Sequence, residues 1–108
     1  EDPKFTIKTM VISAHWPGAS VEDTTTQVTE RIEKKLEELD TLDYTRSVSS
    51  PGSTTIFLNL KDTVRGDAVT QTWIRVRNMI RDISPQFPQG VVGPFFNDQF
   101  GDVYGNVY

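Results

Sequence analysis

The sequence predicts an α+β fold in which a four-stranded antiparallel sheet carries two helices on one face. Three observations lead to this prediction. Two segments place apolar residues at helical spacing, four shorter segments are typical of strands, and the order along the chain is strand, helix, strand, strand, helix, strand. A chain of 108 residues suits a single domain.

The first strand and the first helix lie in the amino-terminal part of the chain. Residues 6–16 alternate between two faces, and the pair Pro17-Gly18 ends this strand. Ser20 is the expected N-cap of a helix over residues 21–39. The apolar residues of that helix form one stripe: Val21, Val28, Ile32, Leu36 and Leu39.

A hairpin and a second helix follow. Residues 43–50 and 53–61 are expected strands, joined by a turn at Pro51-Gly52. Asp67 is the expected cap of the second helix, because it directly precedes a second apolar stripe. That stripe comprises Val69, Trp73, Val76, Ile80 and Ile83.

The last expected strand runs from Val91 to Phe96, with Pro94 indicating an edge position or a bulge. Two crossover units joined by a hairpin form a ferredoxin-like sandwich, and right-handed crossovers place both helices on one face. The other face stays open. We expect a neighbour to cover it, with Phe57 and Phe95 among its side chains.

The composition excludes several classes of function. A net charge of −4 argues against a nucleic-acid surface, which needs clustered Lys and Arg. The absence of Cys removes disulfides, thiolate metal sites and cysteine nucleophiles. No apolar run approaches the roughly 18 residues that a membrane helix needs. The first residue is Glu1 rather than Met, so we expect a segment to precede it.

Side chains that often carry chemistry are explained more simply by structure. His15 is the only histidine, and a zinc site would need partners that the sequence does not offer. None of Ser13, Ser53 and Thr55 is expected to stand in a triad relation to this histidine. We therefore predict no enzyme, no metal and no cofactor.

Two further clusters favour the same conclusion. Met10 and Met79 could suggest copper(I), but their wide separation is more typical of core packing. An acidic cluster alternates with Lys34 and Lys35, so we interpret it as a solvated helix face and not as an acid/base site. That cluster comprises Glu30, Glu33, Glu37, Glu38 and Asp40.

The fold alone leaves function open, because RNA-recognition domains and acyl-phosphate hydrolases share this plan. An RNA reader wants aromatic residues amid basic ones on a central strand, yet residues 53–60 contain no Lys or Arg. An acyl-phosphate hydrolase needs an arginine in the loop after the first strand, and residues 17–20 contain none.

An ordered set of motifs resembles the first porter subdomain of resistance-nodulation-division (RND) drug exporters of the acriflavine-resistance type. The set covers essentially the whole chain. It comprises Ile-Ser-Ala-His-Trp-Pro-Gly-Ala at 12–19, Thr-Gln-Val at 26–28, a Tyr- and Ser-rich strand at 44–50, a Thr- and Ile-rich strand at 53–60, Val-Arg-Asn at 76–78, and Pro-Gln-Phe-Pro-Gln-Gly-Val at 85–91.

The resemblance implies a trimeric, proton-driven inner-membrane transporter that works with a periplasmic adaptor protein and an outer-membrane channel. This chain would be a soluble periplasmic portion of it, in contact with other subdomains and with amphipathic or lipophilic small molecules. Residues 1–97 would form the porter subdomain. Residues 98–108 would form a loop and the start of the next subdomain's first strand.

The resemblance also implies two functional surfaces. Four residues of the second helix would face a central pore, which agrees with their place opposite the apolar stripe: Thr70, Ile74, Asn78 and Arg81. Five residues would border the substrate path: Ser13, Thr55, Phe57, Phe95 and Asn97. Simple packing between domains is the alternative interpretation of these five. Phe57 departs from a small polar residue of some relatives, and Arg81 departs from a neutral one.

Two other functions stay open on the sequence alone. The first is a stand-alone ferredoxin-like domain that binds a small molecule or regulates a partner. The second is a small hydrolase, which the lack of a convergent His, Asp and Arg set disfavours. A parent gene of about 1,000 codons with membrane helices would favour the transporter, whereas a short parent would exclude it.

Overall fold

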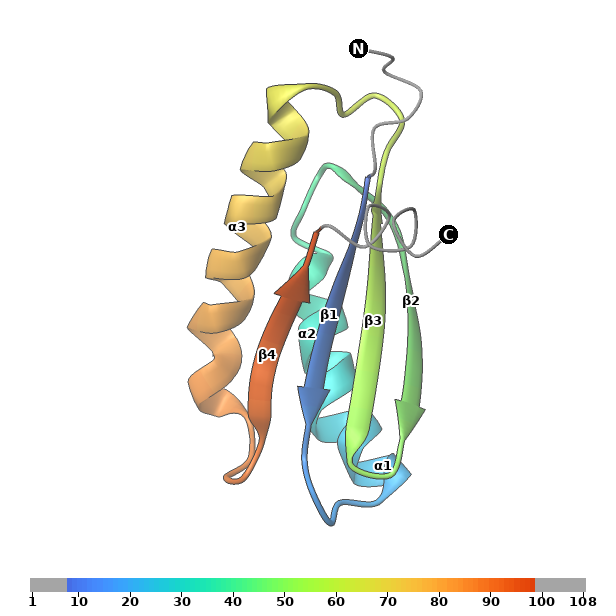
Figure 1. Cartoon of the computed structure of the whole chain (residues 1–108), viewed down its shortest axis with the longest axis vertical. Helices are drawn as coiled ribbons and strands as arrows, with labels where there is room; N and C mark the ends of the chain where they lie inside the picture. The colour runs from blue at the N-terminus through green and yellow to red at the C-terminus, as the bar shows by residue number, and fades with distance from the viewer. Residues whose placement is uncertain (1–7, 99–108) are drawn as a thin grey trace, which may run out of the picture.

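Figure 1 shows the α+β arrangement of the chain in a computed structural model that describes residues 8–98. Four strands form one sheet, and the helices lie against one side of it. The elements in chain order are β1 (Thr9–His15), α1 (Val21–Thr24), η2 (Thr25–Thr29), α2 (Glu30–Leu36), β2 (Leu42–Ser50), β3 (Ser53–Leu60), α3 (Asp67–Ile83), η3 (Ser84–Gln86) and β4 (Val92–Asn97).

The sheet has the strand order β2-β3-β1-β4, and every neighbouring pair is antiparallel. Two βαβ crossovers interleave to produce this order, so the second strand of each unit lies at an edge. Figure 1 looks onto the uncovered side of the sheet, with α2 behind the strands. The predicted ferredoxin-like fold class is confirmed.

The core lies between the inward side of the sheet and the helices. The buried strand residues alternate along β1 and β3, as the strand period requires. Met10 and Met79 both belong to this core, as their interpretation as packing residues predicts. The buried apolar residues are Met10, Ile12, Ala14, Val28, Ile32, Leu36, Leu39, Ile56, Leu58, Leu60, Val64, Val69, Trp73, Val76, Met79 and Ile80.

The first helical segment differs from the single helix predicted over residues 21–39. A π-helical stretch, η2, separates α1 from α2, and the helix ends at Leu36. Leu39 is buried like the stripe before it, but it reaches the core from a turn, where its N–H bonds to the carbonyl of Leu36 at 3.0 Å. The predicted helix was too long at its carboxyl end, because Leu39 follows the helix but is buried and continues its apolar pattern.

The two helix caps were predicted with different success. The Ser20 hydroxyl accepts a hydrogen bond from the backbone N–H of Asp23 at 3.0 Å, which confirms the first N-cap. The prediction that Asp67 caps α3 is wrong. Gly66 occupies the N-cap position with a φ of 60°, and Asp67 is the first helical residue. Its carboxylate still places negative charge in the first turn.

The strand ends also shift slightly. The described part of β1 stops at His15, and Trp16 instead donates its backbone N–H to the carbonyl of Gly52 at 2.8 Å. Pro94 lies on the edge strand β4, opposite a register shift between Ser13 and His15. The two predictions from this proline, an edge position and a bulge, are therefore both confirmed. Residues 6 and 7, and the strand start expected near the carboxyl terminus, lie outside the described residues.

Candidate functional site

The residues assigned to a substrate path lie together on the side of the sheet that no helix covers. Register pairs Ser13 of β1 with Thr55 of β3 and with Phe95 of β4. The adjacent row joins Phe57 and Asn97 through the β1 residue between them. Five residues far apart in the sequence therefore occupy two neighbouring rows of one surface.

We call this surface the open face. Its outward side chains alternate with buried ones along β1 and β3, and register extends the same face onto β2 and β4. The open face comprises Thr9, Val11, Ser13, His15, Tyr44, Arg46, Val48, Ser50, Ser53, Thr55, Phe57, Asn59, Val92, Phe95 and Asn97.

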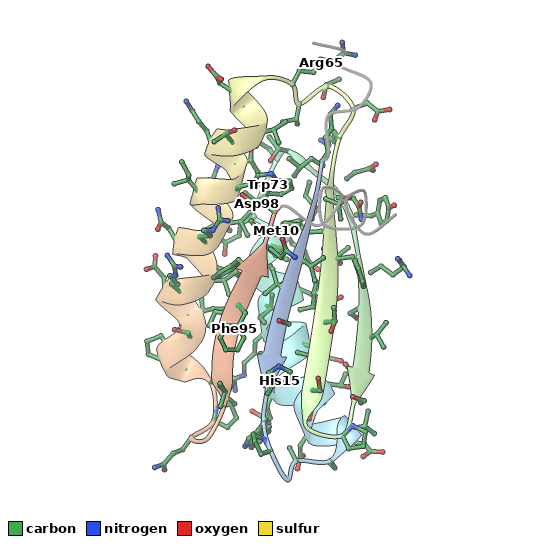
Figure 2. The ribbon with its side chains drawn as sticks, viewed as in Figure 1. Met10, His15, Arg65, Trp73, Phe95 and Asp98 are labelled. Carbon is green, nitrogen blue, oxygen red and sulfur yellow. The ribbon has the colours of Figure 1, made fainter. Side chains whose placement is uncertain are left out.

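Aromatic and aliphatic groups on the open face remain exposed. Tyr44, Val48 and Phe95 are 53%, 58% and 49% exposed. Figure 2 shows His15 and Phe95 on neighbouring strands, and their ring centroids are 6.1 Å apart. A surface that gathers large apolar side chains in this way is typical of a binding or packing interface.

The edge strand β2 supplies residues that the sequence did not single out. Tyr44, Arg46 and Val48 point outward, and the guanidinium carbon of Arg46 lies 4.9 Å from the ring centroid of Phe57. The inward positions of β2 are Thr and Ser, so this strand has no apolar alternation to reveal its orientation. Counting register outward from the Pro51-Gly52 turn would have placed the three residues.

The second predicted surface is the outer side of α3. All four of its predicted residues, Thr70, Ile74, Asn78 and Arg81, are exposed. They lie away from Val76, which is fully buried against the sheet. The structure thus brings these four residues onto one side of one helix, as their spacing predicts.

Two arginines connect this helix to the edge strand β4. Arg77 forms an ion pair of 3.0 Å with Asp98, which follows β4. The guanidinium carbon of Arg81 lies 5.3 Å from the ring centroid of Phe96. Arg81 is therefore exposed but leans toward β4, so it does not point straight out from the helix.

The only histidine has an unexpected neighbour. His15 and Ser53 are paired in register, and the Nδ1 atom of His15 lies 3.4 Å from the Ser53 hydroxyl. The sequence, which was considered only for a triad relation, did not predict this contact between two side chains. No hydrogen bond found among residues 8–98 joins His15 to a carboxylate that would orient it as a general base. Within the same residues, no three His, Asp or Glu side chains gather in a way that could hold a metal ion.

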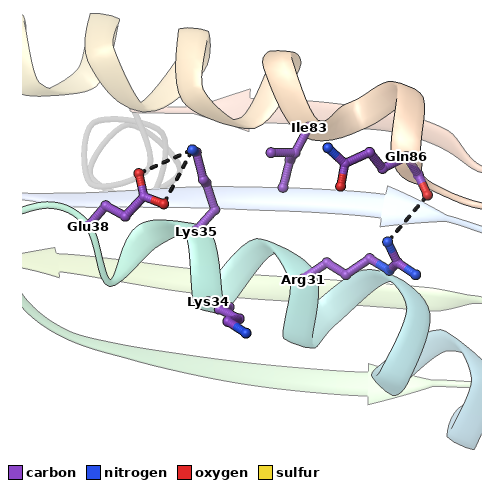
Figure 3. A pocket seen from close by; sticks show the side chains of 6 residues that line it. All are labelled: Arg31, Lys34, Lys35, Glu38, Ile83 and Gln86. Carbon is purple, nitrogen blue, oxygen red and sulfur yellow. Dashed lines mark hydrogen bonds and ion pairs between the residues drawn. The ribbon is translucent and has the colours of Figure 1, made fainter.

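A shallow groove of about 440 Å³ runs between α2 and the end of α3 (Figure 3). Arg31 spans part of it, donating hydrogen bonds to the carbonyl of Gln86 at 3.5 Å and to Oε1 of Gln27 at 3.1 Å. Lys35 is paired with Glu38 at 3.1 Å. Of the predicted acidic cluster, Glu38 lines the groove, and its pairing with Lys35 fits the interpretation of a solvated helix face.

The described residues contain no helix that is both long and apolar enough to cross a bilayer.

Comparison with known proteins identifies the class of protein to which this chain belongs. A relative in Haemophilus influenzae, named only as an uncharacterized transporter, is 28% identical over 102 residues. That alignment covers 94% of this chain and 10% of the relative, so the chain spans about a tenth of the length of the curated relative it matches.

The family follows from a broader match. The chain belongs to the AcrB/AcrD/AcrF family, whose model it matches over residues 1–99. The resemblance to RND transporters that the motifs indicate is thereby confirmed. The family match and the printed name of the relative both point to a transporter.

Proposed function

We propose that this chain is the first porter subdomain of a proton-driven RND multidrug efflux transporter, and that its open face borders the substrate path. One observation carries the proposal. The five residues assigned to that path by resemblance lie in two adjacent rows of a surface that the chain's own helices leave uncovered. Exposed aromatic side chains there suit a lipophilic ligand.

The outer side of α3 has a second role in this proposal. Its four exposed residues line a central pore where three protomers meet. The 53% exposure of Ile74 supports this role, because a large apolar side chain on a solvated helix suits a contact with another protomer. Two surfaces on opposite sides of one small domain then serve one path.

The proposal fixes the surroundings of the domain. It belongs to the periplasmic region of an inner-membrane homotrimer and packs against other subdomains of the same transporter. The assembled pump works with a periplasmic adaptor protein and an outer-membrane channel, and it exports amphipathic or lipophilic small molecules. Residues 1–97 form the subdomain, and residues 98–108 lead into the next one.

Cysteine labelling of the full-length transporter tests both surfaces, because this chain contributes no native cysteine. We expect an exported dye to slow maleimide labelling of a Thr55→Cys variant. An Ile74→Cys variant should form cross-links between protomers. The matched control is Glu30→Cys, which is exposed on α2 and lies on neither surface.

The outcomes separate the two roles. Dye protection at Thr55→Cys without cross-linking at Ile74→Cys would remove the pore from the proposal and leave the substrate path. Labelling of Thr55→Cys and Glu30→Cys at equal rates, with and without dye, would contradict the substrate path.

A further inference from the structure

We propose that Arg46 gives the open face a preference for anionic amphiphiles, with the lipophilic body on the apolar side chains and the anionic group on the guanidinium. The inference rests on the proposed function, because it names the substrate class of the same surface.

Charge is almost absent from the four strands. Apart from His15, β1, β3 and β4 contain no charged residue, and Arg46 is the only Lys or Arg within any described strand. The single carboxylate of β2 is Asp43, which lies in the irregular stretch where pairing shifts between Leu42 and Tyr44. His15 adds no negative charge in either protonation state. The open face therefore opposes cations and favours anions.

Arg46 is also held in place without using its hydrogen-bond donors. Its guanidinium carbon lies 4.9 Å from the centroid of the Phe57 ring, in the range of a cation–π contact. A phenyl ring accepts no conventional hydrogen bond, so the five N–H groups stay available. Among residues 8–98, Arg46 takes part in no ion pair. The residue is exposed, and its donors can reach a ligand on the open face.

The neighbours of Arg46 suit the other end of such a ligand. Phe57 lies opposite it in register, and Tyr44 and Val48 flank it on the same side of β2. Both flanking side chains are more than half exposed. A planar guanidinium binds carboxylate, sulfate and sulfonate groups through paired N–H donors, which a lysine could match only as a point charge. Aromatic and aliphatic surface beside such a fork fits an amphiphile with an acidic head group.

The remaining polar groups of the open face are uncharged. Ser13 and Thr55 offer hydroxyl groups that can bind neutral parts of a ligand. Neither of them can compensate a cationic head group. A quaternary ammonium ligand on this surface would meet like charge at Arg46 and no carboxylate in the rows around it.

Two amphiphiles with the same tail and opposite charge provide the test. We compare growth inhibition by dodecyl sulfate and by dodecyltrimethylammonium in a Gram-negative host that lacks its own exporters and carries the complete transporter with its partners. Arg46→Gln should lower protection against dodecyl sulfate about tenfold, the size of losing one hydrogen bond to a charged group. Protection against dodecyltrimethylammonium should stay unchanged or rise. Arg46→Lys should restore part of the loss, because it keeps the charge.

The controls distinguish the inference from the function on which it rests. Arg75→Gln removes one exposed charge from α3, far from the open face, and should change neither value. Equal loss for both amphiphiles in Arg46→Gln would overturn the inference and would indicate that Arg46 pairs with a carboxylate of a neighbouring subdomain. No effect in Arg46→Gln would overturn it as well. In either case, dye protection of Thr55→Cys would still support the substrate path, so the two failures remain distinguishable.

Discussion

The hydroxyl of Thr29 donates a hydrogen bond of 2.6 Å to the hydroxyl of Thr54, and both residues are buried. Thr29 ends the π-helical stretch η2, and Thr54 lies on the inward side of β3. The hydroxyl of Ser49 lies 3.1 Å from that of Thr29, so the bond belongs to a small polar network between helix and sheet. This network lies beside the apolar core contact of Val28, which belongs to the same stretch η2.

Replacing Thr29 by valine should destabilise the chain by about 1–2 kcal/mol. Valine keeps the shape of threonine but leaves the buried hydroxyl of Thr54 without its 2.6 Å partner, and such a group costs desolvation free energy. Urea unfolding followed by circular dichroism measures the change. Thr25→Val is the matched control, since Thr25 lies in the same stretch, is half-buried and takes part in no side-chain hydrogen bond within residues 8–98. Equal stability of the two variants would contradict the role of the network.

Gly52 should tolerate no side chain. A Cβ at this position would lie 2.8 Å from the carbonyl oxygen of Trp16, and the φ of 73° is unfavourable for any other residue. We expect Gly52→Ala to cost roughly 2 kcal/mol or more, because strain and a backbone clash act together. Thermal unfolding provides the measurement.

The control for this glycine separates strain from clash. Gly18 has a similar φ of 88°, but a Cβ there would meet nothing within 4 Å. Gly18→Ala should therefore cost about 1 kcal/mol, the strain alone. If the two alanine variants unfolded at the same temperature, the close approach between Gly52 and Trp16 would have no energetic weight.

Two isoleucines test the division between core and surface. Ile56 is fully buried on β3, whereas Ile74 is 53% exposed on α3. Ile56→Ala should cost about 2–5 kcal/mol, because it removes buried apolar contacts and leaves a cavity. Ile74→Ala should change the stability of the isolated chain by less than about 0.5 kcal/mol. A large loss in Ile74→Ala would mean that this residue packs within its own domain and is not free to face a pore.

The fold was predicted most accurately where the apolar residues of an element follow a clear period. Strand β3 alternates cleanly, and its observed bounds differ from the prediction by one residue. The prediction of the first helical segment was less accurate. Leu39 continues the apolar stripe from a turn, and no feature of the sequence indicates the π-helical stretch η2. The misassigned cap of α3 reflects two competing signals, since both Gly66 and Asp67 are favoured at an N-cap.

Prediction of the open face was partial for a related reason. Ser13, Thr55 and Phe57 alternate with buried apolar residues, so their orientation could be deduced from the strand period. Arg46 could not be placed in this way, because the inward side of β2 is polar and no apolar alternation marks its buried face. Only register with β3 shows that it lies over Phe57. The proximity of His15 to Ser53 was missed because it depends on the same kind of cross-strand pairing.

The isolated 108-residue chain should bind lipophilic ligands only weakly. Binding free energy of about 25 cal/mol per Å² of buried apolar area requires a site that encloses the ligand. Small-molecule pockets bury most of a ligand's surface, whereas the open face can contact a ligand from one side only. Isothermal calorimetry of the chain with N-phenylnaphthylamine or monomeric dodecyl sulfate should therefore detect no micromolar affinity. Under the proposed function, neighbouring subdomains complete the site, so the complete transporter should bind the same ligands more tightly. Micromolar binding to the isolated chain would show that the open face is a sufficient site and that neighbouring subdomains add little.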